Sequence, residues 1–442
     1  MLIEGLELSS AIVGCVILWR TTVIERFRGF ASSMFLLCYV PLFCVYPVIA
    51  RWLAGGAISI DRRVSEILQD PDIYLIYQGY NAVILAGCLM LSVLSHAPLG
   101  RVNARGVRPL PCYSLFAALC LGIFLYIYST GLSVAELLIA SRFEWFLNDN
   151  YSSLMSVFAS YFVALTPALV YLAARDGRRR LLVVTLLLLV GYGMLSKDRK
   201  WLIFIVSGLL AARYVRMRCE ISLSGRGLFW LGLFAVALAF WQVARGLVFD
   251  ALVTGGGDLA SEIPRMVEQL LTRGDLPYYY NASMTAIHMN LNEGFSIPLG
   301  LLRRQLFFFL PADFSFGLKI EDISAIFSDA VDGGDEVRRG NMPPGLVGLL
   351  VLSFEWWGGW IVVFGLPFVL RLIDNLIRRS SGVVQIAIIS NVLSATLLLL
   401  RGDDSSATYF TFFTIFVLYF LDVSERIFRL PVARPAQAQN PQ

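Results

Sequence analysis

Long apolar runs alternate with short polar segments along the whole chain. Eleven runs are long enough, or nearly so, to cross a bilayer, namely Leu2–Trp19, Phe30–Ala50, Ile73–Leu94, Cys112–Tyr128, Leu154–Ala174, Leu181–Leu195, Trp201–Ala212, Gly227–Val243, Gly345–Leu370, Val383–Leu400 and Tyr409–Leu421. A hydrocarbon core about 30 Å thick needs roughly 20 apolar residues per helix. Backbone groups cannot stay unpaired in lipid, and an alternating strand pattern is absent from the sequence. The pattern predicts an all-α polytopic membrane protein with about 11 transmembrane helices.

The composition supports this class. Of the 442 residues 57% are hydrophobic and only 15% charged, which excludes soluble enzymes, DNA-binding modules and disordered scaffolds. The net charge is +4, and the arginines form short clusters between apolar runs, so nucleic acid is not an expected partner. The chain has only two histidines and no HExxH or CxxC spacing, so we expect neither a metal site nor a cofactor.

Arginine-rich loops follow the odd-numbered runs, beginning with Arg20, Arg26 and Arg28 after the first. Cytoplasmic loops retain Lys and Arg, so the N-terminus is expected outside. The loop between the sixth and seventh runs breaks this rule, because it lies outside yet contains three cations, Lys197, Arg199 and Lys200. Two interpretations remain open. Either a helix is miscounted or the lysines are interface anchors, or the loop binds a phosphate-bearing lipid at headgroup depth.

One external segment is far longer than an ordinary connection and divides the chain. The expected regions are eight helices in 1–244, a large external loop in 245–341, three helices in 342–423 and a tail in 424–442. The loop is net acidic but contains many cations, among them Arg245, Arg273, Arg303, Arg304, Arg338 and Arg339. Its apolar pieces, Met266–Leu271 and Leu299–Leu310, are typical of helices on or dipping into the membrane.

Two motifs lie where external loops meet helices, and a carboxylate lies within an apolar run. Arg401-Gly402-Asp403 ends the tenth run, and it is either a simple turn or part of a site. Arg338 and Arg339 precede Pro343-Pro344-Gly345, which suits the start of a helix whose N-terminus favours anions. Glu355 lies in the ninth apolar run, where an unpaired carboxylate is costly unless it faces water or a cation. Trp356, Trp357 and Trp360 follow it as interface aromatics or a stacking surface for sugars.

These features resemble the Wzy-type O-antigen polymerases, which join oligosaccharide repeat units in bacterial envelopes. The resemblance covers roughly 181–421 and comprises Ser196-Lys197-Asp198-Arg199, Arg245, the large external loop and the stretch Met342–Gly348. The chain departs from the family's pattern after Gly348, where Leu349 replaces an acidic residue.

The resemblance implies a GT-C-like, metal-independent glycosyltransferase in the bacterial inner membrane, with its active face in the periplasm. Its substrate would be a glycan linked to undecaprenyl pyrophosphate, and its other partners would be membrane lipids and a chain-length regulator. The implied catalytic residues are Arg245, Arg339 and Asp403. The implied pyrophosphate and glycan contacts are Lys197, Arg199, Lys200, Arg273, Arg303, Arg304, Arg338 and Arg401.

The identity of the proton acceptor stays open. Asp403 ranks first, because Arg401 would keep its carboxylate ionised, and a helix cap is its competing structural interpretation. The other candidates are Asp404, Asp275, His288 and Glu355. Two alternative functions also remain. An O-antigen ligase differs only in its acceptor, whereas a lipid-linked oligosaccharide flippase or transporter would need polar residues deep within several helices.

Overall fold

The computed structural model describes residues 2–25, 29–53, 67, 70–94, 112–139, 152–196, 200–217, 275–307, 320, 322–332, 343–380 and 382–428. Helices dominate these residues, and no β-strand occurs among them. The first half contains α1 (Leu2–Trp19), η1 (Arg20–Ile24), α2 (Phe30–Tyr39), η2 (Val40–Val45), α3 (Tyr46–Leu53), α5 (Pro71–Leu94), α6 (Cys112–Thr130), α7 (Val134–Ile139), α9 (Ser153–Val163), α10 (Thr166–Arg175), α11 (Arg179–Ser196) and α12 (Lys200–Arg216). The second half contains α15 (Asp275–Asn292), α16 (Gly300–Phe307), α17 (Ile323–Asp332), α18 (Gly345–Arg379), α19 (Val383–Arg401) and α20 (Asp404–Phe428).

Eight helical segments among the described residues are long and apolar enough to span a membrane: Glu4–Ile24, Phe30–Ile49, Pro71–Leu91, Cys112–Thr130, Leu154–Arg175, Arg179–Ser196, Gly345–Arg379 and Val383–Arg401. The shorter apolar stretch Thr408–Ser424 lies within α20. The protein is therefore an all-helical, multispanning membrane protein. The expected run Gly227–Val243 lies outside the described residues, so the count of eleven stays a prediction. The last helix extends to Phe428, past the expected boundary at residue 423.

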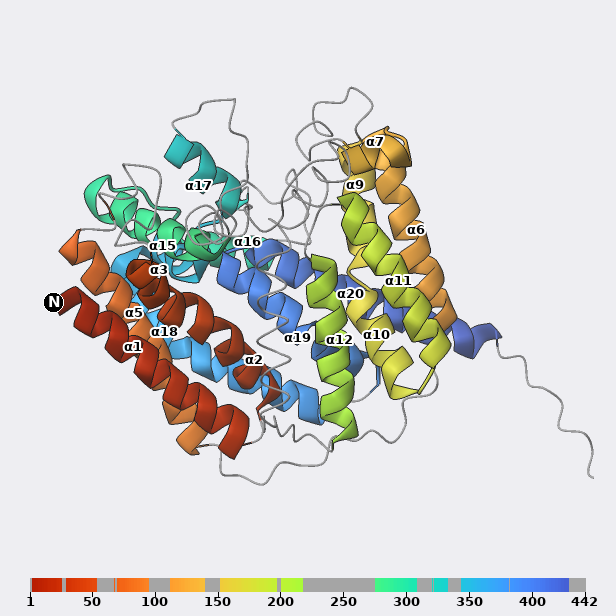
Figure 1. The fold of residues 1–442 in the computed structure, drawn as a ribbon, viewed down its shortest axis with the longest axis horizontal. Helices are drawn as coiled ribbons and strands as arrows, with labels where there is room; N and C mark the ends of the chain where they lie inside the picture. Colours follow the sequence, from red (N-terminus) through yellow and green to blue (C-terminus); the bar gives the residue numbers. More distant parts are fainter. Residues whose placement is uncertain are drawn as a thin grey trace, which may run out of the picture.

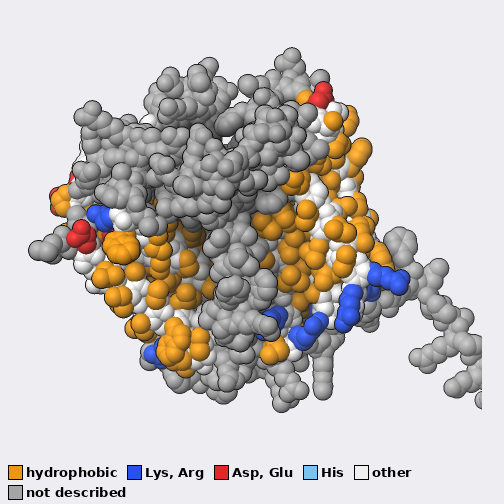
Figure 2. All heavy atoms as spheres, viewed as in Figure 1, with side chains coloured by type: hydrophobic (Ala, Val, Ile, Leu, Met, Phe, Trp, Pro, Cys, Tyr) orange, Lys and Arg blue, Asp and Glu red, His pale blue; other side chains and the backbone are white. Residues whose placement is uncertain are grey.

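Several arginines gather at one end of the helical bundle. This end, called the arginine face, carries Arg175, Arg178, Arg179, Arg180, Arg213 and Arg216. Arg178 lies 5.4 Å from the ring centre of Tyr113 at the start of α6, and Arg216 donates a 2.7 Å hydrogen bond to the carbonyl of Ala174. Figure 2 shows Lys and Arg side chains along the lower right edge, below a broad hydrophobic surface. The described arginines that follow the fifth and seventh runs, which were predicted on one side of the membrane, therefore share one end of the bundle.

The opposite end, called the site face, carries α7, α15, α16, α17 and the turn between α19 and α20 (Figure 1). A reciprocal pair caps α7 there: the Ser133 N–H donates to Glu136 Oε2 over 2.7 Å, and the Glu136 N–H donates to Ser133 Oγ over 3.3 Å. The hydrogen bonds with Ser133 hold the pKa of Glu136 below its usual value, and the bond with the Ser133 side chain has the largest effect.

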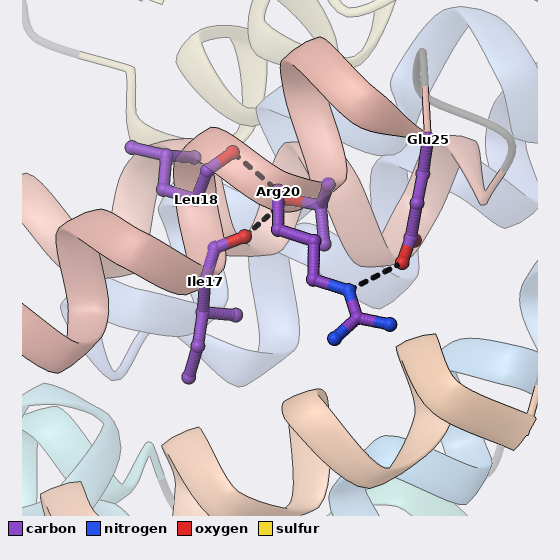
Figure 3. A network of polar contacts seen from close by, with 5 residues as sticks. Ile17, Leu18, Arg20 and Glu25 are labelled. Atoms are coloured by element: carbon purple, nitrogen blue, oxygen red, sulfur yellow. Dashed lines mark hydrogen bonds and ion pairs between the residues drawn. The ribbon is translucent and has the colours of Figure 1, made fainter.

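The end of α1 that lies away from the site face widens into the π-helix η1 (Figure 3). Arg20 Nε lies 3.2 Å from Glu25 Oε1, so the wider turn closes with an ion pair. Nearby, Asp374 of α18 accepts the Ala31 N–H over 2.6 Å and thereby satisfies a free donor at the start of α2. These contacts fix the ends of α1, α2 and α18 that lie away from the site.

A polar ladder lies inside the bundle along one face of α5. Tyr74, Gln78 and Asn81 follow the helical spacing i, i+4 and i+7. Gln78 Nε2 donates to the Tyr74 hydroxyl over 2.9 Å, and Ser10 of α1 donates to Gln78 Oε1 over 2.8 Å. The Tyr39 hydroxyl donates to Asn81 Oδ1. Because lipid offers no partners, these bonds hold α1, α2 and α5 together.

An ion pair joins α3 to α1, and a tyrosine of α15 packs on α5. Arg51 Nε lies 2.9 Å from Glu7 Oε2, and the Glu7 side chain is only 2% exposed. The Tyr280 ring of α15 meets the Tyr77 ring edge-on, with 4.9 Å between their centres. The predicted external loop is therefore not separate from the bundle, because α15 packs on α5 and α18.

The ninth expected span is divided in two. A helix of 35 residues would be about 52 Å long, well beyond the hydrocarbon thickness. Its dihedrals break at Glu355, which has φ 57° and ψ 168°. Residues 345–353 are all buried beneath α15 and α16, whereas the part after the break exposes a hydrophobic stripe that includes Trp357, Ile361, Phe364 and Phe368. The outward-facing apolar part of α18 thus begins after Glu355, which lies at its site-face end.

Candidate functional site

Two motifs that are distant in the sequence touch at the site face. Gly402 follows α19 with φ 87°, and a Cβ there would come within 2.7 Å of the Gly345 backbone nitrogen. Gly345 has φ 70°, and a Cβ there would overlap the Ser283 hydroxyl of α15. Ser283 Oγ in turn donates to the Pro344 carbonyl over 3.2 Å. Only glycine suits both positions, so Arg401-Gly402-Asp403 lies against Pro344-Gly345.

The start of α17 joins this contact. Ser324 Oγ donates to the Gly402 carbonyl over 3.5 Å, and the Ser324 N–H donates to Asp322 Oδ1 over 3.0 Å. The second oxygen of Asp322 lies 3.5 Å from a terminal nitrogen of Arg304. The Arg304 side chain is only 12% exposed, so the ion pair is largely removed from solvent. Asp322 therefore orders α17 and holds the Arg304 guanidinium beside the turn.

Helix α16 bridges α18 and α20. At its N-terminus, the Leu299 N–H donates to the Ser353 carbonyl over 2.7 Å, and the Leu301 N–H donates to Ser353 Oγ over 3.1 Å. At its other end, Thr408 Oγ1 donates to Gln305 Oε1 over 2.8 Å. Arg303 and Arg304 lie between these two anchors. The bridge therefore places two guanidinium groups between the break in α18 and the start of α20.

One side of α16 is apolar and open. Leu302 and Leu306 are 46% and 73% exposed, and Leu299 just before the helix is 53% exposed. Arg303 and Arg304 are only partly exposed. A short helix with open leucines beside arginines is suited to the membrane interface, where an apolar face meets lipid and cations meet headgroups. This agrees with the predicted interfacial helix in Leu299–Leu310.

Asp403 caps a helix. Its Oδ1 accepts the Ser406 N–H over 3.0 Å, which is the side-chain contact that satisfies a free donor at the start of α20. The sequence offered two interpretations of this carboxylate, a proton acceptor and a helix cap. The hydrogen bond provides direct support for the cap. His288, another candidate, contacts the Asn292 side chain at 2.9 Å.

Glu355 is the carboxylate at the break in α18. Its side chain is exposed, and it forms no hydrogen bond or ion pair with the rest of the described chain. A backbone at φ 57° and ψ 168° lies in a region that glycine alone adopts readily, and it costs a residue with a Cβ about 1 to 3 kcal/mol. The Trp356 and Trp357 rings lie 3.5 Å apart beside it, and Trp360 stacks on Tyr80 with 4.6 Å between ring centres. Glu355 therefore occupies a strained position, and its side chain has no partner among the described residues.

Lys200 and Arg401 lie at the same end of neighbouring helices. Ser207 of α12 donates to the Ser390 carbonyl of α19, which fixes the two helices side by side. From that contact, a rise of 1.5 Å per residue carries Lys200 about 10 Å and Arg401 about 16 Å toward the site face. Lys200 is thus at the expected end of the bundle.

The structure brings together four of the predicted site residues, namely Arg303, Arg304, Arg401 and Asp403, and it places Lys200 at the same face. Six others, Lys197, Arg199, Arg245, Arg273, Arg338 and Arg339, lie outside the described residues and stay predictions. The sequence reasoning missed Asp322, Ser283 and the Gln305–Thr408 pair. Asp322 had a signal, because an Asp just before Ile323 is a typical helix cap.

No known protein family, curated protein or solved structure matches this chain. The chemistry of the site is therefore the basis for a function. Partly buried arginines beside an open apolar surface suit a lipid that carries phosphate groups. Carboxylates at both ends of α16, Glu355 and Asp403, could receive a proton or orient a hydroxyl near that phosphate.

Proposed function

We propose that this protein is a membrane glycosyltransferase that polymerises glycan repeat units linked to undecaprenyl pyrophosphate, at the periplasmic face of a bacterial inner membrane. The observation that carries the proposal is the bridge formed by α16. It holds Arg303 and Arg304 beside the turn at Gly402 while Leu302 and Leu306 stay open to lipid. A substrate with its phosphates at headgroup depth and its chain in the membrane fits that arrangement.

The reaction needs little from the protein beyond positioning and charge. The growing glycan is attached through its first sugar to pyrophosphate, which is a good leaving group once its negative charge is stabilised. Guanidinium groups provide this stabilisation through paired, charge-assisted hydrogen bonds and need no metal ion. The acceptor hydroxyl of the next repeat unit then attacks the sugar carbon, and a nearby carboxylate receives its proton.

Transport of the same lipid-linked glycan is a second candidate, favoured by one observation. Gln78 and Asn81 are polar residues deep in the bundle, as a translocation path requires. Their side chains are only 5% and 0% exposed, and they bond to Tyr74 and Tyr39. A closed ladder of this kind joins helices, and it offers no surface to a passing sugar. The enzyme is therefore the better-supported function.

The test is the glycan made by cells that lack the protein. Loss of a polymerase leaves single repeat units on the acceptor lipid, whereas loss of a ligase or flippase leaves the acceptor without glycan. We expect single units in the deletion strain, and long chains again when the wild-type gene is returned. Arg304→Gln should fail to restore them, and Arg216→Gln, on the arginine face, should succeed. Long chains in the deletion strain would contradict the proposal.

A further inference from the structure

The break in α18 is stabilised by a segment from outside the helix. In a continuous helix the carbonyls of Leu352 and Ser353 would accept the N–H groups four residues later. Instead they accept the N–H groups of Ile297 and Leu299, over 2.8 and 2.7 Å. The carbonyl of Trp356, just after the break, accepts the Tyr80 hydroxyl over 2.9 Å. These contacts maintain the break without any help from the Glu355 side chain.

Within the described part of the chain, nothing in the packing therefore requires glutamate at this position. Its φ of 57° lies in the left-handed region, which glycine adopts freely and a residue with a Cβ does not. The carboxylate is exposed, and no hydrogen bond or ion pair ties it to another described residue. A strained residue with an unused carboxylate is better explained by what it does to a ligand.

Two backbone hydrogen bonds link the break at Glu355 to the start of the arginine pair. The carbonyl of Ser353, two residues before Glu355, accepts the Leu299 N–H over 2.7 Å. The Leu299 carbonyl accepts the Arg303 N–H over 2.8 Å. The same short segment thus positions both the break and the start of the arginine pair.

The simpler alternative is that Glu355 lies at the membrane interface and has no chemical role. Trp357 is 68% exposed and belongs to the open hydrophobic stripe of α18, as an interface aromatic would. A carboxylate at such a depth can remain solvated by headgroups without any chemical role. This alternative predicts that the side chain can be removed without loss, and it predicts that glycine at this position is harmless.

We propose that Glu355 is the catalytic base of the reaction, a role that rests on the proposed function. Its carboxylate accepts the proton of the acceptor hydroxyl as that oxygen attacks the first sugar carbon of the donor glycan. The bond from this carbon to the pyrophosphate oxygen breaks, and its electron pair leaves with undecaprenyl pyrophosphate beside Arg303 and Arg304. The proton then passes from Glu355 to water. Asp403 keeps its separate role as the cap of α20.

The decisive variants are Glu355→Gly and Glu355→Gln in the full-length protein. Glycine relieves the strained backbone and removes the carboxylate, so this variant should unfold at the wild-type temperature or above it. Glutamine keeps the size of the side chain and removes its basicity. We expect both to slow linkage formation by roughly 100-fold or more while the substrate KM stays near the wild-type value. Glu136→Gln, an exposed carboxylate on the same face, should retain the wild-type rate.

The pH profile gives an independent readout. The wild-type rate should fall on acidification because a protonated carboxylate cannot accept a proton, and the residual rate of Glu355→Gln should lack this fall. A wild-type rate in either Glu355 variant would overturn the inference. If wild-type protein elongates the glycan and Glu355→Gly does so equally, only this inference fails. If wild-type protein elongates nothing, the proposed function fails instead.

Discussion

Gly402 lies against Gly345, and neither position has room for a Cβ. Both residues have positive φ angles, 87° and 70°. The contact joins the end of α19 to the start of α18, and Ser283 and Ser324 attach α15 and α17 to the same point through hydrogen bonds. The loop helices are thus fixed to the bundle where the candidate site begins.

This contact predicts a steric effect at Gly402. Gly402→Ala combines an unfavourable φ with overlap against Gly345, and it should cost about 2 to 4 kcal/mol of folding free energy. Gly177→Ala is the matched control, since Gly177 follows α10 with φ 69° but no atom lies within 4 Å of the position that a Cβ would take there. It should cost about 1 to 2 kcal/mol. Thermal unfolding of the detergent-purified proteins measures the difference, and equal unfolding midpoints would disprove the contact.

A second prediction concerns the cap of α20. Asp403→Ala removes the oxygen that accepts the Ser406 N–H and should cost about 1 kcal/mol. Asp403→Asn keeps an acceptor oxygen and should be nearly as stable as the wild type. If Asp403 acts only as a cap, Asp403→Asn also builds long glycan chains. Short glycan from a stable, membrane-inserted Asp403→Asn protein would restore Asp403 as the proton acceptor.

The helices were largely predictable because a membrane-spanning helix needs a long apolar run, whatever that helix packs against. The runs Val383–Leu400 and Cys112–Tyr128 correspond closely to α19 and α6. The break in the ninth run was not predictable. Glu355 lies between apolar residues, and its backbone is set by Ile297 and Leu299, which are more than 50 residues away in the sequence. Hydropathy records the environment of a residue and carries no information on such partners.

The site was predictable in its charges and not in its geometry. Arg401 and Asp403 drew attention because they stand together at the expected outer end of an apolar run. Their contact with Pro344-Gly345 depends on two left-handed glycines, and glycine is equally common in ordinary turns. Likewise, Arg304 was a candidate by charge alone. Its partner Asp322 became visible only once α16 and α17 were placed side by side.

A third prediction tests the geometry of Arg304. Lysine preserves the charge but loses the planar fork that can bind two phosphate oxygens. Arg304→Lys should therefore slow polymerisation nearly as much as Arg304→Gln, by about 100-fold. The length distribution of the surface glycan, at matched protein levels, provides the readout. Arg216→Lys serves as the control on the arginine face. A wild-type distribution from Arg304→Lys would exclude a bidentate role.

A fourth prediction concerns the sides of the membrane. Single cysteines at Glu136 and Met217, both exposed and at opposite ends of the bundle, can be introduced after the native cysteines are replaced. Because arginines are retained in the cytoplasm, an impermeant thiol reagent should label Glu136→Cys in intact cells. It should label Met217→Cys only after lysis. The reverse pattern would place the site face in the cytoplasm.

The central claim is that the site face transfers glycan between lipid-linked repeat units, and reconstitution tests it most directly. Purified protein in liposomes would receive a synthetic repeat unit on undecaprenyl pyrophosphate as its only substrate. We predict lipid-linked chains of two or more units, with one undecaprenyl pyrophosphate released for each new linkage, and no such products with Arg304→Gln. Intact single units after incubation with folded, correctly inserted wild-type protein would contradict the account.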